Sequence, residues 1–143
     1  MKVLVAYDGT QGAKKALEYI LKFREMIECL YVVYIFPRLI PSAVQVDSFS
    51  PHPVVEESSQ ISREILETAK KILDGVEIPC HFINEEAPGE GIARRIVALA
   101  EENGAELIVT GTRKLRGLTK VILGSVSTEL IKISKFPVLV VPP

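Results

Sequence analysis

The sequence has few cysteines, little net charge and no long apolar run. Cys29 and Cys80 are far apart and form no Cys-x-x-Cys pair, which favours structural thiols and no metal site. The 17 basic and 18 acidic side chains give a net charge of -1, so no general attraction to nucleic acid or to an anionic membrane is expected. No apolar run approaches the roughly 20 residues that span a bilayer, and Met1-Lys2-Val3 opens a strand rather than a signal peptide. We therefore expect a cytoplasmic protein without nucleic-acid or membrane partners.

The sequence also lacks the common glycine-rich phosphate motifs and any obvious catalytic pair. No Gly-Lys-Ser or Gly-Lys-Thr follows a first glycine at P-loop spacing, and Gly-x-Gly-x-x-Gly is absent. His52 and His81 have no nucleophile or ligand cluster near them in sequence. Adjacent acids such as Glu85-Glu86 are typical of a solvated surface. We predict no catalytic residue.

What is present is an alternation of apolar strands and amphipathic helices along 143 residues, 48% of them apolar. A chain of this length buries roughly two-thirds of its unfolded surface, which predicts one domain. Strands are predicted at residues 2–7, 30–36, 76–84, 107–110 and 136–141, and helices at 10–24, 56–73, 92–100 and 121–134. This alternation predicts a three-layer α/β sandwich, in which a five-stranded parallel sheet carries helices on both faces.

A proline- and serine-rich segment between Arg38 and Pro53 interrupts this alternation. A loop of this length in a compact domain is usually functional or mobile. Two interpretations stay open, a lid over a ligand site and a mobile connection.

Two turns carry the residues best suited to a ligand. Ligands of open parallel sheets bind beyond the carboxyl ends of the strands. Here those turns carry Asp8-Gly9-Thr10 and Gly111-Thr-Arg-Lys114, and the second turn leads to Gly124-Ser125. Glycines let backbone NH groups approach a phosphate, a helix amino end adds partial positive charge, and the hydroxyls of Ser125 and Ser127 add donors. The pattern predicts an anion site.

The second turn also has a purely structural interpretation. Gly111 and Gly117 then serve as turn residues, and Gly124 serves as a point of close helix packing. The basic residues of this turn also have two interpretations, as positive charge beside a bound anion or as a surface that contacts a partner. These residues are Arg113, Lys114, Arg116 and Lys120.

Four segments together resemble the universal stress protein family along the whole chain. They are Lys2-Val-Leu-Val-Ala-Tyr-Asp-Gly-Thr10, Ala105-Glu-Leu-Ile-Val-Thr-Gly-Thr-Arg113, Leu123-Gly-Ser-Val-Ser127 and Phe136-Pro-Val-Leu-Val-Val141. The resemblance implies a Rossmann-like fold of the adenine-nucleotide alpha hydrolase type, with strand order 3-2-1-4-5.

The resemblance also implies a site for ATP, with Mg if ATP binds. Nucleotide-binding members carry Gly-x-x-Gly, nine residues, then Gly followed by Ser or Thr, which falls here on Gly111, position 114 and Gly124-Ser125. Lys114 replaces the second glycine. A side chain there costs about 1 kcal/mol if the position needs a positive φ, and it would block a phosphate. Alternatively, its charge compensates the phosphates. We expect retained but weakened binding.

Residue roles carry over from the family position by position. Asp8 would face the ribose or the metal-phosphate region, Ile35 the adenine and Gly111 the ribose. Phosphate contacts, partly through backbone NH groups, are implied at Gly124, Ser125, Val126 and Ser127. The structural alternatives are a turn role for Asp8 and a core role for Ile35.

The last predicted strand suggests a homodimer. Phe136 to Val141 is apolar and uncharged, so it would be a pairing hazard at an open sheet edge. The resemblance implies that such strands pair across a two-fold axis. We expect a universal-stress-type binding or signalling module with a conditional adenine-nucleotide site and at most slow ATP hydrolysis. The alternatives are a nucleotide-independent dimeric interaction module, with Lys114 marking a lost site, and a nucleotide hydrolase.

Overall fold

A parallel sheet forms the middle layer of the protein. The computed structural model describes residues 1–37, 53–88, 91–113 and 123–143. Within them the strand order is β3-β2-β1-β4-β5, as the family resemblance implied. The strands are β1 (Lys2–Ala6), β2 (Cys29–Phe36), β3 (Cys80–Glu86), β4 (Leu107–Gly111) and β5 (Val138–Val141). Every pairing between neighbours is parallel, which confirms the predicted sheet.

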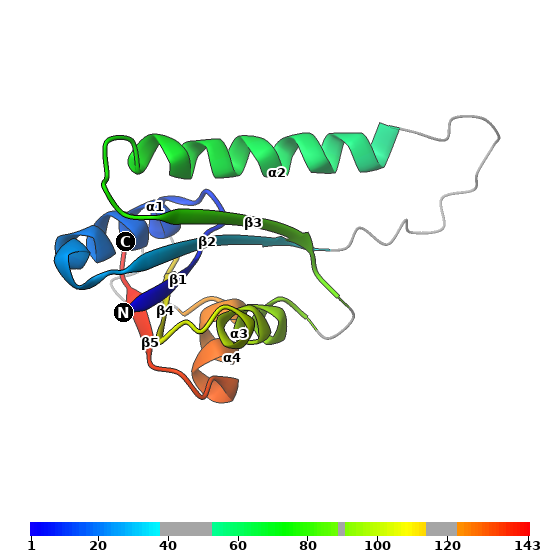
Figure 1. The fold of residues 1–143 in the computed structure, drawn as a ribbon. Helices are drawn as coiled ribbons and strands as arrows, with labels where there is room; N and C mark the ends of the chain where they lie inside the picture. Colours follow the sequence, from blue (N-terminus) through cyan, green and yellow to red (C-terminus); the bar gives the residue numbers. More distant parts are fainter. Residues whose placement is uncertain (38–52, 89–90, 114–122) are drawn as a thin grey trace, which may run out of the picture.

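Helices cover both faces of the sheet and complete the three layers (Figure 1). One face carries α1 (Gln11–Ile20), which continues into the short 3-10 helix η1 (Leu21–Met26), and α2 (Pro53–Ile72). The other face carries α3 (Ile92–Glu102) and α4 (Ser125–Ile133). In the described part of the chain no helix is long and apolar enough to cross a membrane.

Two apolar clusters hold these layers together. Along β1, Val3 and Val5 pack with α1 and α2, whereas Leu4 packs with α3 and α4. All three side chains have no exposed surface. Because both faces of the central strands are covered, the strands are apolar at successive positions instead of alternating with polar residues.

Prolines explain three of the boundaries that sequence periodicity misplaced. The second predicted helix begins at Pro53 rather than at residue 56, because a proline at the first helical position needs no hydrogen bond from its nitrogen. The third strand begins at Cys80 rather than at residue 76, directly after Pro79. The fifth begins at Val138 rather than at Phe136, directly after Pro137. Proline has no NH group to donate to a sheet ladder.

Two helices also differ from their predicted bounds. The first leaves α-helical geometry after Ile20, and Phe23 within η1 has φ -106° and ψ 18°. The last begins at Ser125 rather than at residue 121, with Gly124 as its N-cap. The segment predicted as a long loop after Arg38 lies outside the described residues as far as position 52.

Candidate functional site

A small polar pocket lies at the carboxyl ends of β1 and β4, against the first turn of α4. Its volume is about 120 Å³. The structure brings six of the eight predicted site residues into its lining, namely Asp8, Gly111, Gly124, Ser125, Val126 and Ser127. The seventh, Ile35, lines an adjoining pocket. Lys114 lies outside the described residues, as do Arg116 and Lys120 of the same segment.

The adjoining pocket is larger and more apolar. Its volume is about 360 Å³. The end of β2 contributes Val33 and Ile35, and α3 contributes Ile92 and Ile96. Tyr7, Tyr34 and Pro37 also line it. The residues that it shares with the small pocket are Ala6, Asp8, Thr10, Arg113, Ser125 and Val126. A polar pocket therefore opens beside an apolar one, an arrangement that suits a ligand with one anionic and one flat, apolar end.

Asp8 is both a turn residue and a pocket residue. Its Oδ1 accepts hydrogen bonds from the Thr10 backbone NH at 3.0 Å and from the Thr10 hydroxyl at 2.6 Å. The same Thr10 oxygen accepts from the Ala13 NH at 3.3 Å, so Thr10 is the N-cap of α1. Oδ2 of Asp8 lies 3.8 Å from Nη2 of Arg113, and these side chains are 44% and 73% exposed. Such an exposed pair contributes little stability, so Oδ2 is available to a ligand.

The amino end of α4 is suited to an anion. Gly124 caps it in extended geometry, and no side-chain hydrogen bond caps the helix at this position. The first NH groups of any α-helix have no partner within the helix, and they carry partial positive charge. The hydroxyl of Ser127 is buried and donates to the Gly124 carbonyl at 3.0 Å. Backbone NH groups are therefore the principal donors that this end of α4 offers to a ligand.

Thr112 is a pocket residue that sequence reasoning did not single out. It is 3% exposed, and its Oγ1 has no hydrogen-bond partner among the described residues. An unsatisfied buried hydroxyl costs roughly 1–3 kcal/mol, so it usually has a functional or structural reason. The sequence showed only that Thr112 follows Gly111, and nothing in the pattern indicated that its hydroxyl would be buried.

Gly111 and Gly124, the two glycines of the motif, stand at positions with different packing. A Cβ on Gly111 would lie 2.3 Å from the backbone carbon of Gly12, and a Cβ on Gly12 would lie 2.2 Å from the carbonyl oxygen of Thr112. Close packing of α1 on β4 therefore requires glycine at both positions. Among the described residues, a Cβ on Gly124 would meet nothing nearer than the Ser127 hydroxyl at 3.9 Å, and its φ of -68° suits any residue. Packing within the described residues does not explain Gly124.

Tyr7 anchors the end of β1 beside this site. The Thr68 hydroxyl donates to the Ile65 carbonyl at 2.6 Å, so the phenol of Tyr7 donates to Thr68 Oγ1, also at 2.6 Å. Tyr7 is 2% exposed. Burial raises the pKa of its phenol above the ordinary value of 10.0, and the charge of Asp8 adds to this effect. The folded state thus favours the neutral phenol.

Tyr7→Phe is expected to lower the free energy of unfolding by about 1 kcal/mol at neutral pH, because one buried hydrogen bond is lost. The wild type is expected to lose stability as pH rises above the ordinary pKa, since the unfolded chain ionises its phenol first. That alkaline decline becomes shallower in Tyr7→Phe. Urea denaturation between neutral pH and pH about 11 measures both effects. Tyr19→Phe is the control, because that ring is 38% exposed; equal losses in both variants would contradict this role of Tyr7.

No three His, Cys, Asp or Glu side chains of the described residues lie close enough together to hold a metal ion. The described lining residues of the two pockets offer backbone NH groups, hydroxyls, one arginine and one carboxylate.

The fold and this site define a class, a parallel α/β protein with a polar pocket at the carboxyl ends of its strands. The sequence model of the universal stress protein family matches residues 1–142, and the chain belongs to that family. The predicted family resemblance is confirmed.

Individual members of the family match this chain in sequence or in fold over nearly its whole length. A universal stress protein of Methanocaldococcus jannaschii is 32% identical over an alignment of 148 positions, which covers 98% of this chain and 81% of the relative. The crystal structure of a universal stress family protein from Burkholderia pseudomallei superposes with a TM-score of 0.76 at 26% identity, covering 99% of this chain and 96% of that one. A universal stress protein from Archaeoglobus fulgidus, solved in complex with dAMP, gives a TM-score of 0.69 at 22% identity, covering 99% and 97%.

Proposed function

We propose that this protein is a universal-stress-type binding or signalling module of the cytoplasm whose conditional ligand is an adenine nucleotide. The observation that carries the proposal is the unpartnered, buried hydroxyl of Thr112 in a polar pocket at the amino end of α4, directly beside an apolar pocket. A nucleotide has this same division into an anionic and an apolar end. The dAMP bound to the Archaeoglobus fulgidus protein is consistent with this ligand class.

The polar pocket would hold the phosphates. The backbone NH groups of the first turn of α4 supply donors and partial positive charge. The guanidinium of Arg113 needs to give up only a weak, exposed contact with Asp8 to reach an anion. Gly124 leaves room for close approach, because no side chain projects from its Cα. Thr112 lines the same pocket, and its buried hydroxyl has no hydrogen-bond partner among the described residues.

The apolar pocket would hold the base. Its volume of about 360 Å³ lies within the roughly 300–1,000 Å³ typical of small-molecule sites. Ile35 at the end of β2 lines this pocket together with Ile92 and Ile96 of α3, so aliphatic side chains would contact the ring. Asp8 stands between the two pockets and would meet the ribose, or hold Mg beside the phosphates.

We propose binding rather than rapid turnover. Asp8 is the only carboxylate among the described lining residues of the two pockets, and one of its oxygens is engaged by Thr10. A group that activates water must reach the proton it removes, and no second base is available among these lining residues. Slow hydrolysis of ATP is the most that this arrangement supports.

A homodimer is also part of the proposal. β5 is the last strand in the sheet order, so one of its edges has no partner strand among the described residues. Val138, Leu139 and Val140 are only partly buried there. An apolar open edge favours pairing with a second copy. A monomeric mass by light scattering at micromolar concentration would contradict this assembly.

The nucleotide proposal is tested by calorimetric titration of nucleotide-free protein with Mg-ATP and with AMP, beside a Lys114→Gly variant. Micromolar binding by the wild type is the expected result. Recovery of binding only in Lys114→Gly would identify the lysine as a block and favour the nucleotide-independent dimeric module. Absence of binding in both proteins would contradict the proposed ligand class, whereas turnover well above the buffer background would indicate a hydrolase.

A further inference from the structure

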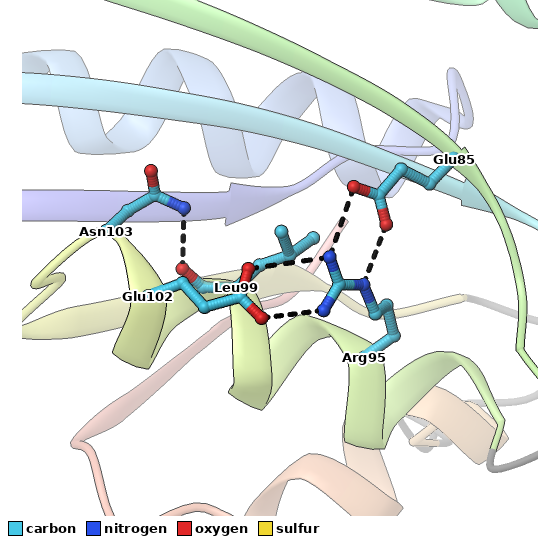
Figure 2. Close-up of polar contacts among 5 residues, drawn as sticks. All are labelled: Glu85, Arg95, Leu99, Glu102 and Asn103. Carbon is cyan, nitrogen blue, oxygen red and sulfur yellow. Dashed lines mark hydrogen bonds and ion pairs between the residues drawn. The ribbon is translucent and has the colours of Figure 1, made fainter.

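Arg95 of α3 joins two carboxylates from different elements (Figure 2). Its Nε lies 2.7 Å from Oε2 of Glu85, and its Nη2 lies 3.2 Å from Oε1 of the same residue. On the other side, Nη1 and Nη2 lie 2.9 and 3.4 Å from the two oxygens of Glu102. Both contacts are bidentate, which is the geometry that best fixes an arginine side chain.

The two carboxylates differ in what they connect. Glu102 lies on α3 itself, so its contact with Arg95 stays within one helix. Glu85 lies on β3, so its contact joins α3 to the edge of the sheet. The side chain of Arg95 is 24% exposed and that of Glu85 36%, so water weakens this contact less than it weakens a fully exposed pair. Glu85 and Glu102 both raise the pKa of Arg95 through these hydrogen bonds.

The contact between β3 and α3 also joins the two walls of the apolar pocket. Glu85 pairs in register with Ile35 of β2, which forms one wall. Ile92 and Ile96 of α3 lie three residues before and one residue after Arg95, and they form the other wall. The ion pair of Arg95 with Glu85 therefore links α3, which carries one wall, to the strand that pairs with β2, which carries the other.

We infer that Arg95 is a positioning residue that fixes the separation of the two walls of the apolar pocket and thereby sets affinity for the base end of the nucleotide. This inference rests on the proposed function. It assigns no direct ligand contact to Arg95, because Arg95 does not line either pocket. The described lining of the polar pocket includes no residue of α3 or β3, so this pocket should not depend on Arg95.

The test compares Glu85→Gln with Glu102→Gln. Both variants remove one charged partner of the same arginine and change the net charge equally, but only Glu85→Gln weakens the link to the sheet. The Kd for AMP is expected to rise about fivefold in Glu85→Gln, equivalent to about 1 kcal/mol, and to stay unchanged in Glu102→Gln. The Kd for pyrophosphate, which needs only the polar pocket, is expected to stay unchanged in both. Arg95→Met should match Glu85→Gln, and Arg95→Lys should recover part of the affinity.

Three other outcomes of this test would each overturn the inference, and one of them would also overturn the proposed function. Equal affinities of Glu85→Gln and Glu102→Gln for AMP, with the wild type binding AMP normally, would overturn the inference and leave the proposed function standing. A parallel loss of AMP and pyrophosphate affinity in Glu85→Gln would also overturn it, because that result indicates general destabilisation. A wild type that binds neither ligand would overturn the proposed function and this inference together.

Discussion

Gly12→Ala is expected to lower the free energy of unfolding by about 3 kcal/mol or more, because the added Cβ would overpack against backbone atoms. Gly12 lies in the first turn of α1, where helix propensity alone makes alanine about 1 kcal/mol more favourable than glycine. The added Cβ would stand 2.2 Å from the carbonyl oxygen of Thr112, and a backbone atom cannot rotate away as a side chain does. The clash therefore outweighs the helix propensity, and the substitution lowers the free energy of unfolding instead of raising it. Urea denaturation followed by circular dichroism measures the loss.

Gly111→Ala probes the same contact from the other side. Its Cβ would lie 2.3 Å from the backbone carbon of Gly12, so it should cost a similar amount. The double variant should lose less than the sum of the two single losses, because separating α1 from β4 once relieves both clashes. A Gly12→Ala protein as stable as the wild type, or more stable, would contradict the close packing of α1 on β4.

The contact between Gly12 and Thr112 illustrates what sequence reasoning could not provide. The strands were predictable because β1, β2 and β4 are short apolar runs, and such runs indicate strands covered on both faces. The approach of α1 to β4, by contrast, joins residues about a hundred positions apart, and no periodicity records it. Gly12 looked like an ordinary helix residue in the sequence, and only the backbone geometry shows why glycine stands there.

The candidate site likewise has features that the sequence predicts and features that only the packed structure shows. Topology places the ends of β1 and β4 at one edge of the sheet, so Asp8 and Gly111 could be assigned to one site from the sequence alone. The burial of Thr112 could not be predicted, because it depends on the packing of segments that are distant in the sequence. Arg95 and Glu85 were equally hidden, since charged residues ten positions apart show no partnership until α3 is laid against β3.

Gly124→Asp is expected to stabilise the protein and to abolish nucleotide binding. Aspartate is among the preferred N-cap residues, so its carboxylate should bond free NH groups of α4 and raise the free energy of unfolding by about 0.5–1 kcal/mol. The described part of the fold accepts the side chain, because a Cβ at this position meets no atom of a described residue closer than 3.9 Å. The same carboxylate would occupy the place of the phosphate and repel it. Affinity for AMP should therefore fall by more than about tenfold, which corresponds to 1.4 kcal/mol or more.

Gly124→Asn separates the two causes of this loss. Asparagine caps a helix about as well as aspartate but brings no negative charge, so its gain in stability should be smaller, about 0.3 kcal/mol. Its loss of AMP affinity should consequently be smaller than that of Gly124→Asp. Paired urea denaturation and calorimetric titration of both variants provide the comparison. If Gly124→Asp gains stability and still binds AMP as the wild type does, the phosphate does not lie at the amino end of α4, and the ligand site must be placed elsewhere. Opposite signs for stability and affinity would instead mean that Gly124 keeps this helix end open for an anion.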